Sequence, residues 1–258
     1  MTRYRLTLEY DGSRFRGWQR QAAGLSVQAS LEAAVAGYSG TVADVHGSGR
    51  TDAGVHALGQ VAHFDLAHPR PPESIRMGLN YHLVRIAGGA IVVLACSEAA
   101  PDFHARFSTV ERSYLYRILT RPSPPVFGRD HLWWMPRALD AAAMATAARP
   151  LVGHHDFTSY RAAGCQANSA LRTLTELTVA RSGPEVTVRA RAPSFLYRQV
   201  RIIVGTLVEV GLGRADTDAP ARALAARSRA AAGPTAPARG LYFEAAICAG
   251  DRSPIDRK

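Results

Sequence analysis

Hydrophobic and polar residues in the first hundred positions alternate between two periods. Residues 3–10 alternate apolar and polar side chains, which predicts a strand. Ser26 then precedes Val27, Leu31 and Val35, whose spacing predicts a helix that begins after a serine N-cap. Further patterns predict a strand entering a glycine-rich segment, a strand at 60–66, a helix at about 73–83 and a strand at 90–95.

The second half of the chain repeats this rhythm. Its patterns predict a strand at 112–119, a helix at 139–151, strands at 171–180 and 185–192, helices at 196–210 and 220–229, and a strand at 241–248. Each half therefore has approximately the order β-α-β-β-α-β, which is typical of a ferredoxin-like or RNA-recognition-type unit.

Adjacent strand pairs favour an α+β fold, with antiparallel sheets that helices cover on one side. The uncovered side of such a sheet is a natural surface for a nucleic acid. We expect two halves, at residues 1–107 and 108–249, and a polar tail at 250–258. The proline-rich stretch at 121–125 is expected to be a loop within the second half.

The charge of the chain indicates which classes of molecule it can bind. The 258 residues carry a formal net charge of +10 and have a sequence pI of about 10.1, which suggests a nucleic acid or an anionic membrane surface. Lys258 is the only lysine, so nearly all of the positive charge is arginine, whose planar fork suits phosphates. A GC-rich genome would explain the choice of arginine over lysine, but not the excess of positive charge.

Cysteine usage and the absence of long apolar runs bear on location. No apolar run reaches membrane-spanning length, and residues 1–10 are charged and alternating, unlike a signal peptide. The three cysteines are far apart and form no C-x-x-C motif, which favours a reduced, cytoplasmic compartment and disfavours a cysteine metal site. We therefore expect a cytoplasmic protein with no membrane contact.

The histidines do not suggest a metal site either. His46, His56 and His63 lack a metal-ligand rhythm, and we expect them to be structural or to face RNA. His154 and His155 lie beside an acid, but we expect them in a loop.

A glycine-rich segment at 47–57 places one carboxylate, Asp52, two residues after Arg50. A basic protein gains nothing from an acid in a groove that binds a polyanion, so Asp52 either shapes a turn or does chemistry. Asp-Ala-Gly is a common turn signature, which keeps the first alternative open. In an extended chain Arg50 and Asp52 would project to one side, and a pair at about 4 Å is worth on the order of 4 kcal/mol at an effective dielectric of 20. Such a pair would keep the acid ionised, as a nucleophile or base requires.

Two other positions could complete a site around this acid. Arg112, Tyr114 and Tyr116 share one face of a predicted strand, where an aromatic ring can stack a base while the arginine holds phosphate. Two core tyrosines are the alternative. Arg201 lies in a largely apolar helix, where a buried guanidinium needs a carboxylate partner. A solvated helix edge that meets phosphate is the alternative there.

The string Gly-Arg-Thr-Asp-Ala-Gly-Val-His at 49–56 resembles the catalytic motif of the pseudouridine synthases, most closely the tRNA pseudouridine synthase A family. The resemblance runs from Tyr4 to about Ile247 and recurs in register at 10–12, 17–20, 102–107, Tyr114, 157–161, 200–205 and 240–242. Agreement in order over nearly the whole chain is far more specific than one motif.

This resemblance implies a fold and a set of site residues. The implied fold is the pseudouridine synthase fold, two halves joined around a central cleft with helices on the outer face. Asp52 matches the nucleophile, and Tyr114 matches an active-site tyrosine that stacks the uracil. Arg50 and Arg201 would orient Asp52, with Arg201 its predicted ion-pair partner. Further substrate contacts would be made by Arg161, Arg20 and Arg106. For Arg161 and Arg20 a solvated loop is the alternative.

The implied activity is the isomerisation of uridine to pseudouridine at positions 38, 39 and 40 of the tRNA anticodon stem-loop, by a homodimer that needs neither metal nor cofactor. The target uridine would have to leave the stack to reach the acid. One carboxylate suffices, whereas hydrolytic glycosidases commonly use two. Two alternatives stay open: an RNA-binding module whose Asp52 only forms a turn, and an RNA-directed glycosidase that releases the base.

Overall fold

The computed structural model describes residues 1–251, which divide into two compact units. Unit 1 comprises Met1–Arg112 and the described residues from Phe243 onward, and unit 2 comprises Ser113–Tyr242. Strands β5 (Thr109–Thr120) and β11 (Leu241–Cys248) each contribute residues to both units. Most of the tail expected at 250–258 lies outside the described residues.

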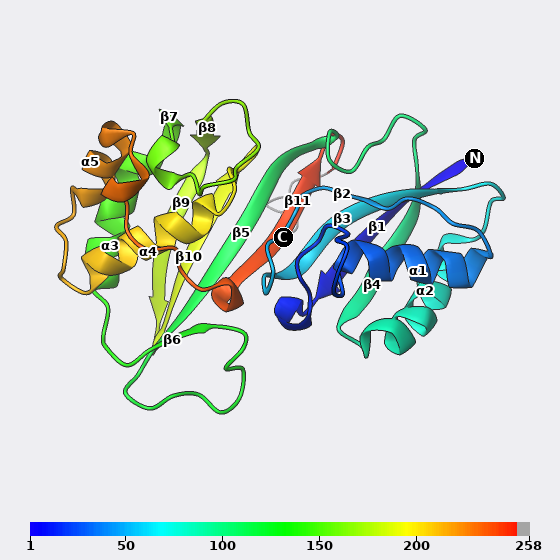
Figure 1. Cartoon of the computed structure of the whole chain (residues 1–258), viewed down its shortest axis with the longest axis horizontal. Helices are drawn as coiled ribbons and strands as arrows, with labels where there is room; N and C mark the ends of the chain where they lie inside the picture. Colours follow the sequence, from blue (N-terminus) through cyan, green and yellow to red (C-terminus); the bar gives the residue numbers. More distant parts are fainter. Residues whose placement is uncertain (252–258) are drawn as a thin grey trace. The chain divides into compact units, whose positions relative to one another are not determined.

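Unit 1 is a sheet that two helices cover on one face (Figure 1). Strand β1 pairs antiparallel with both β3 and β4, β2 pairs with β3, and β11 follows β3 in the strand order. The bounds are β1 (Thr2–Tyr10), α1 (Val27–Ser39), β2 (His46–Gly47), β3 (His56–Leu66), α2 (Pro72–Ala87) and β4 (Ile91–Ala99).

The core of unit 1 follows from the predicted periodicities. Leu6 and Leu8, which alternate along β1, are fully buried, as are Leu31 of α1 and Leu79 of α2. The Ser26 hydroxyl accepts from the Ala29 N–H at 3.3 Å, so the expected N-cap of α1 forms. The order β-α-β-β-α-β is therefore confirmed in this unit.

Unit 2 is built around strands in the order β5-β10-β9, with β6 parallel to β5 and a separate antiparallel pair, β7 and β8. Helix α4 is buried along its length except at Arg201 and Glu209, because its residues are almost all apolar. The bounds are β6 (Trp133–Met135), α3 (Ala141–Ala148), β7 (Gly153–Asp156), β8 (Leu171–Leu174), β9 (Glu176–Ser182), β10 (Glu185–Ala192), α4 (Gln199–Gly211) and α5 (Ala219–Ala226).

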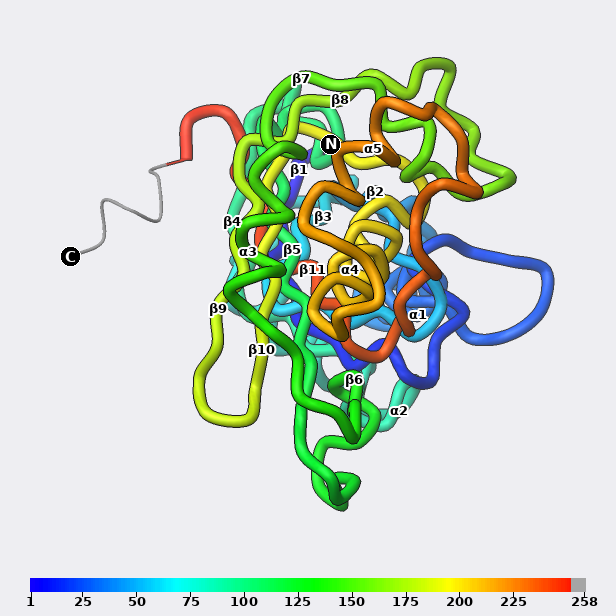
Figure 2. Tube along the Cα trace, turned by 90° about the vertical axis from the view of Figure 1, so that its left-hand side faces the viewer, coloured from blue at the N-terminus to red at the C-terminus, as the bar shows by residue number. Residues whose placement is uncertain are grey.

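The loop expected at 121–125 is confirmed. It belongs to the long connection between β5 and β6, which projects from unit 2 in both views (Figures 1 and 2). The α+β class predicted from the pattern is likewise confirmed.

Several predicted boundaries in unit 2 were wrong. The single strand expected at 171–180 is two strands, β8 and β9, which belong to different sheets and are separated at Thr175. The loop expected around His154 and His155 is strand β7, which pairs with β8. The helix expected at 139–151 is α3 followed by a 3-10 turn (Arg149–Leu151), because Pro150 has no amide proton with which to continue an α-helix.

Candidate active site

Asp52 begins a tight turn in unit 1. The Val55 N–H donates to the Asp52 main-chain oxygen at 3.1 Å, and Gly54 has φ +78°, a left-handed conformation that favours glycine. The expected Asp-Ala-Gly turn therefore forms. Its hydrogen bond uses the main chain of Asp52, so the turn by itself does not require a carboxylate at this position. The Asp52 side chain is half-buried.

The residue before Asp52 is anchored by the Tyr-Asp-Gly and Gly-Trp segments of the same unit. The Tyr10 hydroxyl and the Thr51 hydroxyl lie 2.9 Å apart, and the Trp18 N–H donates to the Thr51 carbonyl at 3.0 Å. Burial raises the pKa of Tyr10 to about 12, so this phenol stays protonated at neutral pH. A Cβ on Gly17 would lie 2.6 Å from the Thr51 oxygen, which shows how closely the two segments pack.

The start of the motif is fixed by a buried glutamine on β3. Gln60 accepts from the Ser48 hydroxyl at 2.6 Å and donates to the Gly49 carbonyl at 2.8 Å. Ser48 and Gln60 are both almost completely buried, and the Ser48 N–H also donates to the Val61 carbonyl at 2.8 Å. Sequence reasoning missed Gln60, whose completely buried side chain lies among the mostly buried residues of β3.

Arg112 has a different role from the one expected. Its Nε and Nη2 donate to the Ser48 carbonyl at 3.0 and 2.8 Å, and Nη2 also donates to the Arg106 carbonyl at 2.7 Å. The sequence suggested that Arg112 would hold phosphate beside Tyr114. The structure corrects this, because the guanidinium instead ties the segment 104–108 to the motif.

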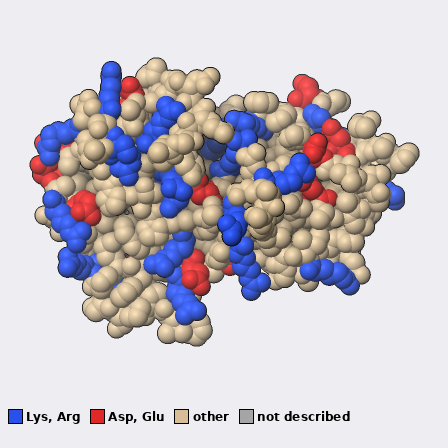
Figure 3. All heavy atoms as spheres, in the orientation of Figure 1, with Lys and Arg blue, Asp and Glu red and all other residues tan. Residues whose placement is uncertain are grey.

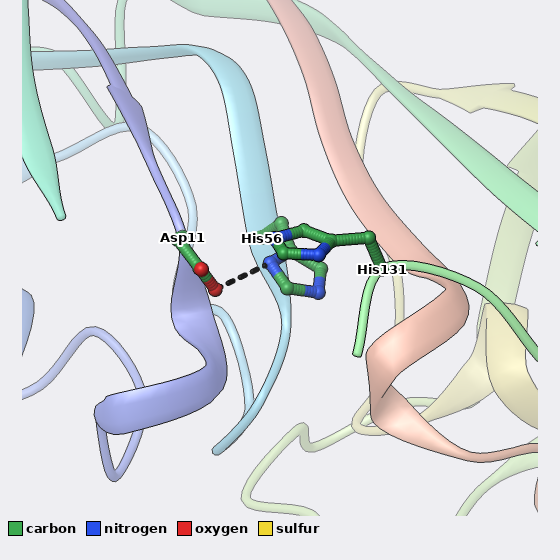
Figure 4. Close-up of side chains that lie close together, drawn as sticks. All are labelled: Asp11, His56 and His131. Atoms are coloured by element: carbon green, nitrogen blue, oxygen red, sulfur yellow. Dashed lines mark ion pairs between the residues drawn. The ribbon is translucent and has the colours of Figure 1, made fainter. Parts of the chain in front are cut away.

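His56 closes the other end of the motif (Figure 4). It is buried, its Nδ1 accepts from the Gly12 N–H at 3.1 Å, and the same atom lies 3.2 Å from the Asp11 carboxylate. The Tyr10-Asp11-Gly12 segment thus supports the motif at both Thr51 and His56.

Arg50 does not take up the position that its spacing suggested. Within residues 1–251 it forms no ion pair, and its side chain is exposed. The expected Arg50–Asp52 pair is therefore a wrong prediction: residues 50–52 lie outside any strand, so the two-residue spacing does not bring these side chains together. Arg50 is accordingly available to bind a substrate.

The other two predicted arginines of unit 1 are surface residues. Arg20 donates from Nη1 to the buried carboxylate of Glu32 at 3.1 Å and also lies 3.9 Å from Asp44. Arg106 is exposed, with its guanidinium carbon 5.8 Å from the Phe107 ring centroid. Arg106 is therefore the freer of the two to reach a phosphate.

In unit 2, Tyr114 packs against a second aromatic ring. Its ring is nearly buried and meets the half-buried Phe195 edge to face, with the centroids 5.1 Å apart. Tyr116 is fully buried, and its hydroxyl donates to the Pro237 carbonyl at 2.8 Å, which makes it a core tyrosine as expected. Sequence reasoning missed Phe195, an aromatic residue just before the N-terminus of α4.

Arg201 lies on α4, half-buried, and its Nε donates to the Ala236 carbonyl at 2.8 Å. The Ala236 N–H donates back to the Arg201 carbonyl at 3.0 Å, so this arginine holds the segment before β11 against the helix. Asp52 belongs to unit 1, and its pairing with Arg201 stays a prediction.

Arg161 also binds main-chain carbonyls. Its Nη2 donates to Cys165 and Ala167 at 2.8 and 2.7 Å, which closes the loop that follows Phe157-Thr158-Ser159-Tyr160. Phe157 and Tyr160 are fully buried. Arg161 itself is half-buried.

The face of the molecule in Figure 3 shows basic side chains spread over both units, with fewer acidic ones. Because Lys258 lies outside the described residues, every basic side chain drawn there is an arginine. In residues 1–251 no helix has the length and apolar character needed to cross a membrane.

Comparison with known proteins identifies the family. A family model described as tRNA pseudouridine synthase matches residues 7–108 and 147–247. The tRNA pseudouridine synthase A of Rhodospirillum rubrum is 54% identical over 243 residues, covering 94% of this chain and 86% of the relative. The enzymes of the same name from Rhodospirillum centenum and Sinorhizobium fredii are 53% and 50% identical, each over 94% of this chain and 98% of the relative. The chain belongs to the tRNA pseudouridine synthase family, as its motifs indicated.

Proposed function

We propose that this protein isomerises uridine to pseudouridine at positions 38, 39 and 40 of the tRNA anticodon stem-loop, with Asp52 as the nucleophile. One observation carries the assignment: a half-buried carboxylate stands on a turn that buried side chains hold at Thr51, Ser48 and His56. A fixed acid in a basic protein suits covalent catalysis, and the chain belongs to a family of tRNA pseudouridine synthases.

The chemistry needs one nucleophile and no external reactant. Asp52 attacks the ribose or the base of a flipped uridine, and the glycosidic C1′–N1 bond breaks. The uracil turns in the site and C5 bonds to C1′, while the covalent bond between Asp52 and the ribose or base breaks and restores the carboxylate. The C5 proton leaves and N1 gains one. The product has the composition of the substrate, so neither water nor a cofactor is consumed.

The remaining site residues receive roles that fit their surroundings. Tyr114, whose ring Phe195 supports, stacks the uracil and relays the final proton. Arg201 orients Asp52. Arg50, exposed and outside any ion pair in residues 1–251, contacts the RNA as the base leaves its stack.

We further propose the partners and setting that the family resemblance implies. Arg20, Arg106 and Arg161 bind the backbone of the tRNA, and the protein acts as a cytoplasmic homodimer without a metal ion. Residues 1–107 carry the nucleophile, and residues 108–249 supply the stacking and orienting groups.

A tritium assay tests the reaction directly. The protein is incubated with tRNA labelled at uridine C5, and tritium released to water is measured with the mass of the tRNA. We expect the wild type to release tritium without changing the mass of unlabelled tRNA. Asp52→Asn should release none. Its Kd for tRNA should stay within about threefold of the wild-type value, because a neutral amide leaves the basic surface intact.

Asp216→Asn is a suitable control, because it neutralises an exposed aspartate that pairs with Arg222. It should react like the wild type. Undiminished tritium release by Asp52→Asn would exclude Asp52 as the nucleophile. Binding without release would leave only an RNA-binding module, and abasic sites in the product would indicate a glycosidase.

A further inference from the structure

A cluster of aromatic rings on unit 1 has no part in the chemistry proposed above. His46 of β2 stacks on His63 of β3 with 5.0 Å between ring centroids and 24° between planes. His104 packs against His63 at 4.6 Å, and Phe107 packs against His104 at 4.4 Å. Four rings from three separate segments thus form one continuous aromatic cluster.

The inner half of this cluster is held rigidly. His63 is only 2% exposed, and its Nδ1 accepts from the Ala105 N–H at 3.1 Å. The Nδ1 of His104 accepts from the Arg106 N–H at 3.2 Å. Both rings therefore carry their proton on Nε2 when neutral. Burial, with the neighbouring His104, His46 and Arg3, lowers the pKa of His63 to about 4, so it is neutral at physiological pH.

The outer half of the cluster faces solvent. Phe107 is 76% exposed, although burying a phenylalanine side chain is worth about 1.5–3 kcal/mol. His46 is exposed, and the Arg106 guanidinium lies 5.8 Å from the Phe107 centroid. Exposed rings beside an arginine are the combination with which proteins stack unpaired bases and hold their phosphates.

The cluster is mechanically joined to the Asp52 motif within unit 1. Arg112 donates to the Ser48 carbonyl at the start of the motif and to the Arg106 carbonyl beside the cluster. His46 stands immediately before the motif and pairs with His63 in the β2–β3 ladder. A ligand on the exposed rings would therefore contact a surface fixed to the catalytic turn.

We propose that Phe107, His46 and His104, together with Arg106, bind an unpaired nucleotide of the tRNA by stacking, separately from the target uridine. The inference rests on the proposed function in taking tRNA as the ligand. An unpaired nucleotide fits because bases inside a helix have both faces covered by their neighbours. The exposed ring of Phe107 offers a face for the base, and Arg106 offers a charge for its phosphate.

The test compares tRNA binding by Phe107→Ala, Phe107→Trp and a control, Met77→Ala. Met77 is an exposed apolar residue on α2, 60% accessible, and outside the proposed surface. All three changes are made in Asp52→Asn protein, so that the tRNA is not altered during the measurement. We expect Phe107→Ala to raise the Kd for tRNA about 10-fold at fixed salt, and Phe107→Trp and Met77→Ala to leave it nearly unchanged.

Two further measurements separate stacking from a structural effect. In protein with Asp52 intact, Phe107→Ala should raise KM by a similar factor with kcat unchanged. The tryptophan of Phe107→Trp should lose fluorescence when tRNA is added, relative to the three native tryptophans. Thermal unfolding of Phe107→Ala should match the wild type, because the side chain is exposed.

The proposal is overturned if the Kd of Phe107→Ala equals that of the control, if kcat falls while KM stays constant, or if the added tryptophan is not quenched. It is also overturned if the variant changes only the oligomeric mass, which would make Phe107 a subunit contact. If wild-type protein releases no tritium, the proposed reaction fails, but the Kd comparison still decides this inference.

Discussion

Two irregular segments carry proposed site residues and are held in place differently. Residues 47–56 of unit 1 are fixed by buried, mostly uncharged groups, among them the Tyr10 hydroxyl and the Gln60 amide. The loop after Tyr160 in unit 2 is fixed by two half-buried arginines. Arg161 donates to two carbonyls of the loop, and Arg172 donates to the Ser169 carbonyl at 3.0 Å.

This difference bears on function because the loss of a buried hydrogen bond and the loss of an exposed one have different energetic costs. A buried hydrogen bond that loses one partner leaves the other unsatisfied, at about 1–3 kcal/mol, whereas an exposed carbonyl regains water. The first segment can therefore hold a nucleophile in one position, as catalysis requires. The second can change shape at little cost, which suits a surface that fits itself to RNA.

Gly12→Ala should break the first segment most severely. A Cβ at this position would lie 2.0 Å from the Val55 carbonyl oxygen, so the turn after Asp52 must move. We expect kcat for tritium release to fall at least about 100-fold, the typical consequence of displacing a catalytic group by about 1 Å.

Gly164→Ala is the counterpart in the second segment. Gly164 has φ +78°, but no other atom lies within 4 Å of the place that a Cβ would take, so the cost is the left-handed conformation alone, about 1–2 kcal/mol of stability. Its kcat should stay within about twofold of the wild type, since no displacement reaches the turn. Equal losses of kcat in the two variants would contradict the comparison.

Gln60→Leu should have the next largest effect. It leaves the buried Ser48 hydroxyl and Gly49 carbonyl without their partner, and we expect a loss of about 2–4 kcal/mol in the free energy of unfolding. Urea denaturation measures this loss.

Arg172→Met, its counterpart, should cost less than about 1 kcal/mol, because the Ser169 carbonyl is in an exposed loop and the buried Arg172 Nε has no partner in residues 1–251. A larger loss of unfolding free energy from Arg172→Met would show that the loop after Tyr160 does not deform at little cost.

The sequence predicted what is periodic or local. Strand and helix periods located β1 and α1, Ser26 identified a helix start, and the string at 49–56 pointed to the family. The anchors of the motif were not predictable in this way, because Arg112 and Gln60 act across 64 and 12 residues through side-chain contacts with the motif. The Arg50–Asp52 pair failed for a related reason: the spacing rule holds within a strand, and residues 50–52 lie outside any strand.

Acidification should weaken unit 1 through His63. Its pKa in the folded protein is about 4, against 6.5 ordinarily, so between these values the unfolded chain binds a proton that the folded protein does not. Stability due to this group is thus full above about pH 6.5 and falls as the pH drops toward 4, by about 3 kcal/mol. The groups that act on His63 are His104, His46, Arg3 and Asp65.

The measurement compares urea unfolding of wild type and His63→Gln from pH 7 to pH 4. Carboxylates titrate in both proteins and largely cancel in the difference. The advantage of the wild type should shrink by about 3 kcal/mol over this range. A difference independent of pH would show that His63 is not held neutral. Hydrogen exchange at pH 5 should increase at residues 47–56 and stay constant in the loop after Tyr160, whose arginine anchors do not titrate.

Arg161→Lys should have the smallest effect and tests whether an anchor of the softer loop also binds RNA. Lysine lacks the planar fork that reaches the Cys165 and Ala167 carbonyls together, so hydrogen exchange in the loop should accelerate while stability falls by less than about 1 kcal/mol. Because lysine keeps the charge, tRNA affinity should drop only about twofold, whereas Arg161→Gln should also reduce the slope of log K against log salt by about 1 if the guanidinium meets a phosphate. An unchanged slope in Arg161→Gln, with the same acceleration of exchange, would confine Arg161 to closing the loop. In that case this deformable segment would contact the tRNA only through its main chain and its other side chains.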